Sequence, residues 1–402
     1  MTAQAKTYDL VLKGGHLVDE RNGIDGVTDI AIKAGKVAAV GKDLDPQGAP
    51  VRDVSGCYVS PGLIDIHTHV YHKATSLGID PDFISRRSAT TTLVDAGSAG
   101  AGNYDGLRDF VMKQSPYNIL AFLNVSFPGI FGFDKDVQIG EATLAEMLPV
   151  HRCVQKIEEN RDRIVGVKVR IGGPVTGKFG LGALELALEA ANAVDLPLMT
   201  HIGGPPPSYA DVVSMLRPGD ILTHCYRPEP NSAITENGEI LPEILAARER
   251  GVLFDIAHGM GAFGYESAEV ALRHDFKPDL ISSDVHIVAI EGPAFDLLHT
   301  MSKLLNCGLT VAETLARSSN RPALAINRPE LGHLGVGAVA DITVLQVNEA
   351  KITFEDVRGI RRDGDKLFYP VAVYMAGRES EIARRPFEEG NYVMQPCPCG
   401  GH

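Results

Sequence analysis

Two histidines, His67 and His69, stand two residues apart at the end of the apolar run "PGLIDIHTHV" at positions 61–70. Pro61-Gly62 is typical of a turn, and the residues that follow read as a short buried strand. Because alternate side chains of a strand point to the same side, both imidazoles should project together from its carboxyl end. Imidazole is the commonest metal-ligating side chain, so the pair indicates a metal site, unless two polar residues merely end a strand.

Further polar residues follow later apolar runs. Lys168 lies in "IVGVKVRI", His201 follows "PLMT", His224 follows "ILT" and Asp284 follows "LISS". Each of them alone is compatible with a structural or solvated role. Together with the first pair they form a set of nitrogen and oxygen ligands that suits Zn²⁺, provided that the fold brings them to one place.

The elements that carry these residues are eight short apolar runs separated mostly by helical patterns, such as those at 182–194 and 241–251. The expected strands are Leu63–Ile66, Thr92–Asp95, Ile119–Asn124, Ile164–Val169, Leu198–Thr200, Ile221–Thr223, Leu253–Asp255 and Leu280–Ser282. Eight strand-then-helix units predict an α/β protein with a (β/α)₈ TIM barrel. In such barrels the chemistry lies at the carboxyl ends of the strands, where all the polar residues named above are placed.

The flanking segments have a different rhythm, with short alternating strands between glycine-rich turns. Neither flank has enough strands for an independent sheet, so residues 1–60 and 331–390 are expected to pair into one small β-sandwich domain around the barrel of residues 61–330. The tail 391–402, "NYVMQPCPCGGH", is expected to be flexible. Its Cys397 and Cys399, with His402, are a less favoured metal chelate.

Composition excludes several classes of partner. The formal net charge of −13 argues against nucleic acid and gives no attraction to anionic membranes. Six cysteines are too few for a disulfide scaffold, and the sequence shows neither a secretory leader nor an apolar run long enough to span a membrane. A cytoplasmic enzyme acting on a small molecule is the expectation.

This set of residues resembles the amidohydrolase superfamily in its binuclear-metal form, which has His-x-His after strand one, lysine on strand four, histidines after strands five and six, and aspartate after strand eight. "SNRPALAI" at 319–326 and "HLGVGAVADITVL" at 333–345 are similar to the family's return into the small β domain. The resemblance implies two divalent metal ions, Zn²⁺ above all, although manganese, iron and cobalt accept similar ligands.

The resemblance also implies a role for each ligand. His67, His69 and Asp284 would hold one ion, His201 and His224 the other, and Lys168, carboxylated by CO₂, would bridge both. A bridging water would then ionise near neutral pH and attack a carbonyl, with Asp284 as the general base that passes the proton to the leaving group.

Substrate identity is less constrained. Dihydroorotases of this superfamily typically read His-x-His-x-Arg, whereas Tyr71 stands at the arginine position here, and the cysteine that D-aminoacylases offer after strand two is missing from "LVDAGSAG" at 93–100. What remains resembles deacetylase-like amidohydrolases, which would cleave an acyl amide or ester of an amino acid or α-hydroxy acid. Arg170, His258 and Tyr71 are the candidate substrate-binding residues, against the alternatives of a salt-bridged arginine, a loop-stabilising histidine and a packing aromatic.

Three alternatives stay open. One is a cyclic-amide hydrolase of the dihydroorotase type, and another is a nucleobase deaminase with a single metal, which usually lacks the strand-four lysine. The third is a non-enzymatic relative, which the filled ligand positions disfavour. The loop at 127–142 is expected either to cover the pocket or to pack against a neighbouring subunit of a homo-oligomer.

Overall fold

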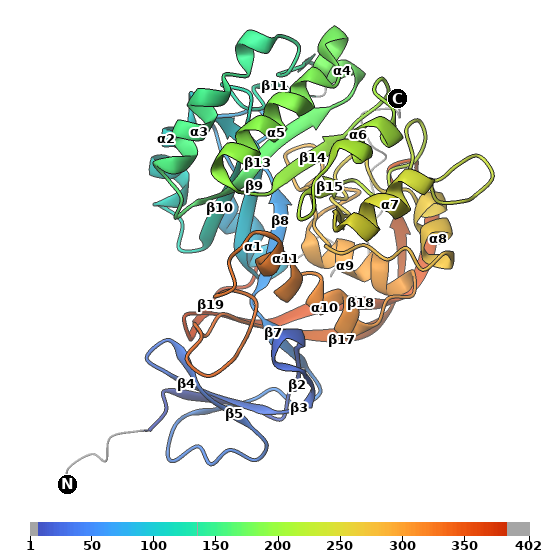
Figure 1. The fold of residues 1–402 in the computed structure, drawn as a ribbon. Coiled ribbons are helices and arrows are strands. Elements are labelled where there is room, and N and C mark those ends of the chain that lie inside the picture. The colour runs from blue at the N-terminus through green and yellow to red at the C-terminus, as the bar shows by residue number, and fades with distance from the viewer. Residues whose placement is uncertain (1–6, 135, 384–402) are drawn as a thin grey trace.

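The computed structural model describes residues 7–134 and 136–383 (Figure 1). The tail at 391–402, with Cys397 and Cys399, lies outside the described residues. Within the described ranges, no helix has the length and apolar character needed to cross a bilayer.

Seven parallel strands form the central sheet, and each is followed by a polar loop at its carboxyl end. They are β8 (Leu63–Thr68), β9 (Thr90–Gly100), β10 (Asn118–Asn124), β13 (Ile164–Ile171), β14 (Leu198–Ile202), β15 (Ile221–Thr223) and β16 (Leu253–Asp255). Their spatial order follows the chain, from β8 at one edge to β16 at the other. This order, with helices outside the strands, is the arrangement of a β/α barrel.

The eighth strand, expected at Leu280–Ser282, is not a regular strand. The segment 280–285 instead makes single parallel bridges to both edge strands, Leu280 to Asp255 of β16 and Val285 to Thr68 of β8. Asp284, at the carboxyl end of the segment, has a left-handed φ of 48°, which a β-strand does not allow. The barrel is therefore closed by an irregular segment that is hydrogen-bonded to both neighbours.

Helices and short turns cover the outside of the sheet. The helices are α1 (Pro81–Ser88), α2 (Tyr104–Leu107), α3 (Val150–Glu158), α4 (Gly173–Thr176), α5 (Gly182–Val194), α6 (Tyr209–Met215), α7 (Pro242–Arg250), α8 (Tyr265–Arg273), α9 (Leu297–Asn306), α10 (Val311–Ala316) and α11 (Asn320–Ala325). A hairpin of β11 (Gly132–Phe133) and β12 (Gln138–Ile139) interrupts the loop after β10.

The side-chain alternation of the barrel strands separates two cores. On β13, Val167 and Val169 belong to the large cluster that packs the helices against the sheet, whereas Lys168 and Arg170 point the other way. A second cluster, with Leu120, Met199 and other apolar residues of neighbouring strands, fills the lower barrel interior. The polar residues at the carboxyl strand ends therefore stand above an apolar floor.

The two ends of the chain form the small β domain, the lower part of Figure 1. One sheet has the order β5-β4-β1-β6, with strands Leu10–Lys13 (β1), Asp29–Lys33 (β4), Lys36–Gly41 (β5) and Val51–Asp53 (β6). The other has the order β19-β18-β17-β7-β2-β3, with strands His16–Asp19 (β2), Ile24–Val27 (β3), Tyr58–Pro61 (β7), Ile342–Glu355 (β17), Arg361–Met375 (β18) and Arg378–Ser380 (β19).

A shared core joins these two sheets into a sandwich. Leu12 and Ile30 of the first sheet pack in one buried cluster with Val59 and Ile342 of the second. The antiparallel register of β7 with β17, from Tyr58–Leu345 to Pro61–Ile342, joins the amino-terminal and carboxyl-terminal segments directly. The expected pairing of the two chain ends is therefore present.

Candidate metal centre

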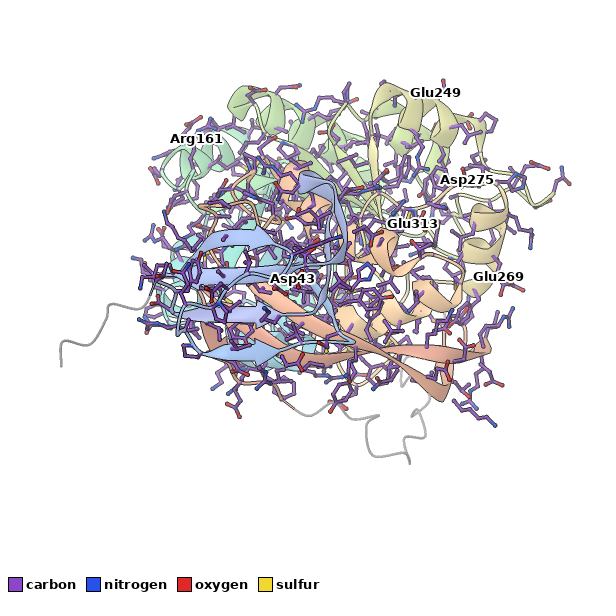
Figure 2. All side chains as sticks on the ribbon, turned by 90° about the horizontal axis from the view of Figure 1, so that it is seen from below. Asp43, Arg161, Glu249, Glu269, Asp275 and Glu313 are labelled. Carbon is purple, nitrogen blue, oxygen red and sulfur yellow. The ribbon has the colours of Figure 1, made fainter. Side chains whose placement is uncertain are left out.

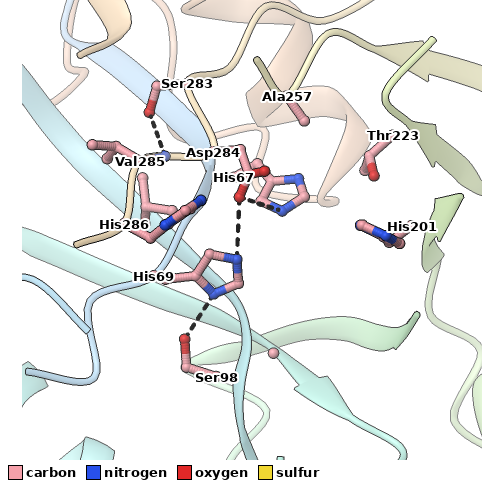
Figure 3. Close-up of polar contacts among 12 residues, drawn as sticks. His67, His69, Ser98, His201, Thr223, Ala257, Ser283, Asp284, Val285 and His286 are labelled. Atoms are coloured by element: carbon pink, nitrogen blue, oxygen red, sulfur yellow. Dashed lines mark hydrogen bonds and ion pairs between the residues drawn. The ribbon is translucent and has the colours of Figure 1, made fainter. Parts of the chain in front are cut away.

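His67 and His69 converge on the carboxylate of Asp284 (Figure 3). Their Nε2 atoms lie 3.3 and 3.2 Å from Asp284 Oδ1. On its other side His69 Nδ1 lies 2.9 Å from Ser98 Oγ, and this contact leaves Nε2 directed at the carboxylate. All three residues are buried. Two ring nitrogens from the end of β8 and one carboxylate oxygen from the segment 280–285 therefore face a common point.

Lys168 reaches this point from β13. Its Nζ lies 3.3 Å from His67 Nε2, and the residue is only 1% exposed. Burial lowers the pKa of Lys168 to about 7, so a substantial part of the amine is neutral at neutral pH. Gly97, at φ +84°, makes room for it, because an added Cβ would lie 2.6 Å from Lys168 Cγ.

His201 and His224 form the other side of the site. His224 Nδ1 lies 2.8 Å from the carbonyl oxygen of Ala257, which can only accept, so the Nδ1 proton is donated to it. The opposite nitrogen, Nε2, therefore carries a lone pair, and it lies 2.6 Å from His201 Nδ1. Burial holds the pKa of both histidines below the ordinary value, so both rings are neutral, as metal ligands must be.

Two buried carboxylates that the sequence reasoning missed hold the eighth segment in place. Asp255 accepts from Ser282 Oγ with its two oxygens at 2.7 and 2.9 Å, and its Oδ2 lies 3.6 Å from His67 Nδ1. Asp65 accepts from both the backbone and the hydroxyl of Ser283. Burial raises the pKa of Asp255 to about 8 and that of Asp65 to about 7. In the sequence, only the two serines directly before Asp284, in "SSD", indicate that side chains could hold this segment by hydrogen bonds.

A small cavity of about 50 Å³ opens beside these side chains. Its lining consists of His67, His69, Leu77, Ile130, Phe133, Lys168, Arg170, His201, Asp284 and His286. Ile130 and Phe133 come from the loop at 127–142, so this loop does cover the cavity, as one of the two expectations had it. A larger cavity of about 510 Å³ lies at the opposite end of the barrel, around Leu196, Pro218 and Leu324, away from every expected site residue.

Arg170 lines the cavity and forms an ion pair with the buried Glu141, so the alternative of a salt-bridged arginine is present in the structure. Its Cζ lies 5.2 Å from the ring centre of Phe133, and its Nη1 lies 3.7 Å from Oε2 of the buried Glu141, beyond hydrogen-bond distance. Within the part of the chain that the structure describes, no hydrogen bond reaches this guanidinium, although its side chain is only 12% exposed. An arginine so placed has donors to offer to an anion.

The other two expected substrate-binding residues do not line the cavity. Tyr71 is 6% exposed, and its hydroxyl donates to the carbonyl oxygen of Asn103 at 2.8 Å. His258 is fully buried between Lys303 and the carbonyl of Gly259, and its ring stacks on Phe263. Both side chains have the structural roles that were their alternatives. His286, in contrast, contacts Phe133 at the cavity wall.

The donor set fits divalent metal ions. Among the described residues, ligand atoms of His67, His224 and Asp284 lie within 4.8 Å of one another. His69, Lys168 and His201 contact members of this group, so six nitrogen and oxygen donors surround one small volume. Surface charges such as Arg161, Glu249 and Asp275 lie at the periphery of the molecule (Figure 2). The candidate ligands His67, His69, Lys168 and His224 are buried instead.

The comparisons with known proteins agree with this arrangement. The sequence model of the amidohydrolase family matches residues 58–366. A deacetylase of Brucella anthropi is 32% identical over 86% of this chain and 86% of that protein, and a deacetylase of Agrobacterium fabrum is 34% identical over 85% and 84%.

Two solved structures are similar over nearly their whole length. One is described as an adenine deaminase, with a TM-score of 0.87 and 31% identity over 93% of this chain and 100% of that one. The other is described as a dihydroorotase, with a TM-score of 0.85 and 31% identity over 92% and 98%. The chain belongs to the amidohydrolase family of metal-dependent hydrolases.

Proposed function

We propose that this protein is a deacetylase that removes a short acyl group from a small carboxylate-bearing molecule, such as an N-acyl amino acid or an O-acyl α-hydroxy acid. The observation that carries the proposal is the guanidinium of Arg170. It lines the cavity at the candidate metal centre and makes no hydrogen bond with the described residues. Similarity to curated deacetylases over most of the chain supports the reaction type.

In this proposal the metal ligands are those named from the sequence. His67, His69 and Asp284 would hold one ion, His201 and His224 would hold the second, and a carboxylated Lys168 would be a ligand of both. The neutral amine of Lys168 is the form that adds CO₂, and its lowered pKa makes that form accessible. Divalent ions bound here would supply hydroxide at neutral pH and polarise the acyl carbonyl.

Asp284 is the proposed general base and acid. Its Oδ1 lies within 3.3 Å of the Nε2 atoms of His67 and His69, so the carboxylate faces the volume between the candidate ligands, where an attacking water would lie. It would take the proton from the attacking water and deliver it to the leaving amine or alkoxide. We expect Asp284→Asn to lose at least about a hundredfold in kcat.

Arg170 is the proposed anchor for the substrate carboxylate. Its guanidinium can donate two parallel hydrogen bonds to a carboxylate while its face stays on Phe133. The cavity beyond it is small and is lined by Leu77, Ile130 and Phe133, which suits an acetyl or similarly short acyl group.

The test is hydrolysis by zinc-loaded protein prepared with bicarbonate. The panel contains N-acetyl amino acids of both hands, O-acetyl α-hydroxy acids, dihydroorotate and adenine. Acetate release from one chiral series, abolished in Asp284→Asn, is the expected result. Near-normal turnover by Asp284→Asn would remove the proposed role of that residue.

A cyclic-amide hydrolase is the second candidate, favoured by the similarity to a structure described as a dihydroorotase. Tyr71 in place of arginine and the burial of its hydroxyl at Asn103 weigh against it. Turnover of dihydroorotate without acetate release from the other compounds would establish it, and ammonia release from adenine would establish a deaminase instead.

A further inference from the structure

Lys303, on α9, is a completely buried lysine outside the cavity. Its Nζ lies 2.7 Å from His258 Nε2, 2.8 Å from the carbonyl oxygen of Pro293 and 2.6 Å from that of Glu355. An ammonium group has three donors and no acceptor, so three acceptors satisfy it fully. Burial lowers the pKa of Lys303 to about 7, and the three acceptors favour its charged form.

These contacts fix the tautomer of His258. Its Nδ1 lies 3.0 Å from the carbonyl oxygen of Gly259, which can only accept, so Nδ1 carries the proton and Nε2 accepts from Lys303. In the other tautomer, His258 would donate from Nε2 to a neutral Lys303. Its Nδ1 would then carry a lone pair facing the carbonyl oxygen of Gly259, and the two acceptors would repel each other. Burial and the nearby Lys303 hold the pKa of His258 well below its usual range, so the ring is neutral.

Gly259 packs directly against the carboxylate of Asp284. Its backbone N–H donates to the carbonyl oxygen of Ser283 at 2.9 Å, and an added Cβ would lie 2.3 Å from Asp284 Oδ2. Its φ of +50° belongs to the left-handed region, which glycine adopts readily, and its carbonyl oxygen accepts the hydrogen bond from His258 Nδ1. A shift of this peptide would open space beside one oxygen of the carboxylate.

We infer that Lys303 is a positioning residue for Asp284, acting through His258 and Gly259. This inference rests on the proposed role of Asp284 in hydrolysis. Lys303 also ties the loop that holds Pro293 and the end of β17 at Glu355 to the same point. The small β domain's long hairpin is thereby linked by hydrogen bonds to the barrel loop behind the candidate metal centre.

The test compares two replacements of His258. In His258→Asn the side-chain amide nitrogen falls near the former Nδ1, so the donor to Gly259 survives while the acceptor for Lys303 is lost. In His258→Gln the amide oxygen falls near the former Nε2, so the acceptor survives while the donor to Gly259 is lost. If the bond to Gly259 positions Asp284, His258→Asn should be closer to the unsubstituted protein than His258→Gln.

Lys303→Met tests the first contact of the relay, by which we mean the contacts from Lys303 through His258 and Gly259 to Asp284. A displacement of a reacting group by about 1 Å costs on the order of a hundredfold in rate, so kcat should fall by about tenfold or more, with KM changed less than about twofold. Lys277→Met is the control, since it removes an ion pair with Glu313 at the partly exposed side of the barrel. The second readout is the visible absorption spectrum of the full-length protein loaded with Co²⁺. This spectrum responds, without any substrate, to a change in how Asp284 would coordinate the bound ion.

The expected result is a changed cobalt spectrum in Lys303→Met and His258→Gln, with total metal content unchanged. An unchanged spectrum and kcat in Lys303→Met would overturn the inference, as would equal effects of the two His258 variants. If Lys303→Met does not fold, His258→Asn decides on Lys303, because it removes the acceptor for Lys303 and keeps the donor to Gly259; an unchanged cobalt spectrum in His258→Asn would overturn the inference. Since the spectrum needs no turnover, a silent substrate panel would contradict the proposed function and leave the relay still tested.

Discussion

Three residues at the candidate metal centre have left-handed backbone conformations although none is glycine. His224 has φ 72°, Ala257 has φ 41° and Asp284 has φ 48°. Such residues cost on the order of 1 kcal/mol or more each and collect at sites where function requires an unusual side-chain direction. Here the left-handed turn comes directly where two barrel elements end, and it directs the His224 ring and the Asp284 carboxylate toward His67.

At the residue scale, we predict that Arg170→Gln weakens binding of carboxylate substrates. Hydrogen bonds between charged groups contribute about 1.5–3 kcal/mol, so KM should rise by about tenfold or more. The methyl ester of the same substrate should be affected much less, because it carries no charge. Arg152→Gln is the control, since Arg152 is exposed and lies over Phe127 instead of the cavity. Equal changes for acid and ester would contradict the anchor.

Gly97→Ala is predicted to displace Lys168, because the new Cβ would lie 2.6 Å from Lys168 Cγ. The matched control is Gly219→Ala, whose φ of +83° is nearly the same but whose Cβ would meet nothing within 4 Å. The control should cost about 1–2 kcal/mol in unfolding free energy from the backbone alone. Gly97→Ala should cost more and should also lose bound metal, measured by elemental analysis. Full metal content in Gly97→Ala would contradict the prediction that metal binding depends on the position of Lys168.

At the scale of elements, the segment 280–285 is held by side chains in place of a regular ladder. Asp255 of β16 binds Ser282, and Asp65 of β8 binds Ser283, so each neighbouring strand fixes one residue directly before Asp284. A regular strand would not permit the left-handed turn at Asp284, whereas two carboxylate–serine contacts do. The irregularity of this element is thus what directs Asp284 into the barrel.

We therefore predict that Ser282→Ala destabilises the protein by about 1–3 kcal/mol, because it leaves the buried carboxylate of Asp255 without its hydroxyl partner. Ser318→Ala is the control, since Ser318 is equally buried but its hydroxyl has no hydrogen-bond partner in the described structure. Urea unfolding of both variants measures the difference. Equal stability of the two variants would mean that the carboxylate–serine contact contributes nothing.

At the scale of the whole molecule, the barrel and the small β domain share contacts along their length. Strand β7 is followed within one residue by β8, and Thr343 of β17 donates its hydroxyl proton to the carbonyl oxygen of Ala89 in the barrel. The distal half of the β17–β18 hairpin packs into the barrel core, because Phe354 and Phe368 belong to the barrel's hydrophobic cluster. The two parts should therefore unfold together.

Phe354→Ala tests this coupling. Phe354 is fully buried, so its truncation should cost about 3–5 kcal/mol and should lower the unfolding midpoint of the entire protein in one transition. Phe110→Ala is the control, as Phe110 is 80% exposed and should change little. Far-ultraviolet circular dichroism and tyrosine fluorescence follow the unfolding. Two separate transitions in Phe354→Ala would contradict a shared core.

Much of this fold could be predicted from local pattern. The runs at Leu63, Ile164 and Leu198 became parallel strands because continuous apolar stretches of that length fit a sheet buried on both faces. The helical patterns at 182–194 and 241–251 became α5 and α7 within a residue or two. The irregularity of the eighth strand was not predicted, because the two serines before Asp284 do not by themselves reveal that Asp65 and Asp255, far away in the chain, accept hydrogen bonds from them.

The sequence by itself determined that the six candidate ligands meet, because polar residues placed after successive parallel strands have only one end of a barrel to occupy. It also determined that the two chain ends share a sheet, since neither has strands enough alone. Only the tertiary structure decided which nitrogen of His224 faces the site, that Arg170 makes no hydrogen bond with residues in the described ranges, and that His258 and Tyr71 point elsewhere. Those facts depend on contacts between residues far apart in the chain, such as Lys303 with His258, and no local pattern encodes such contacts.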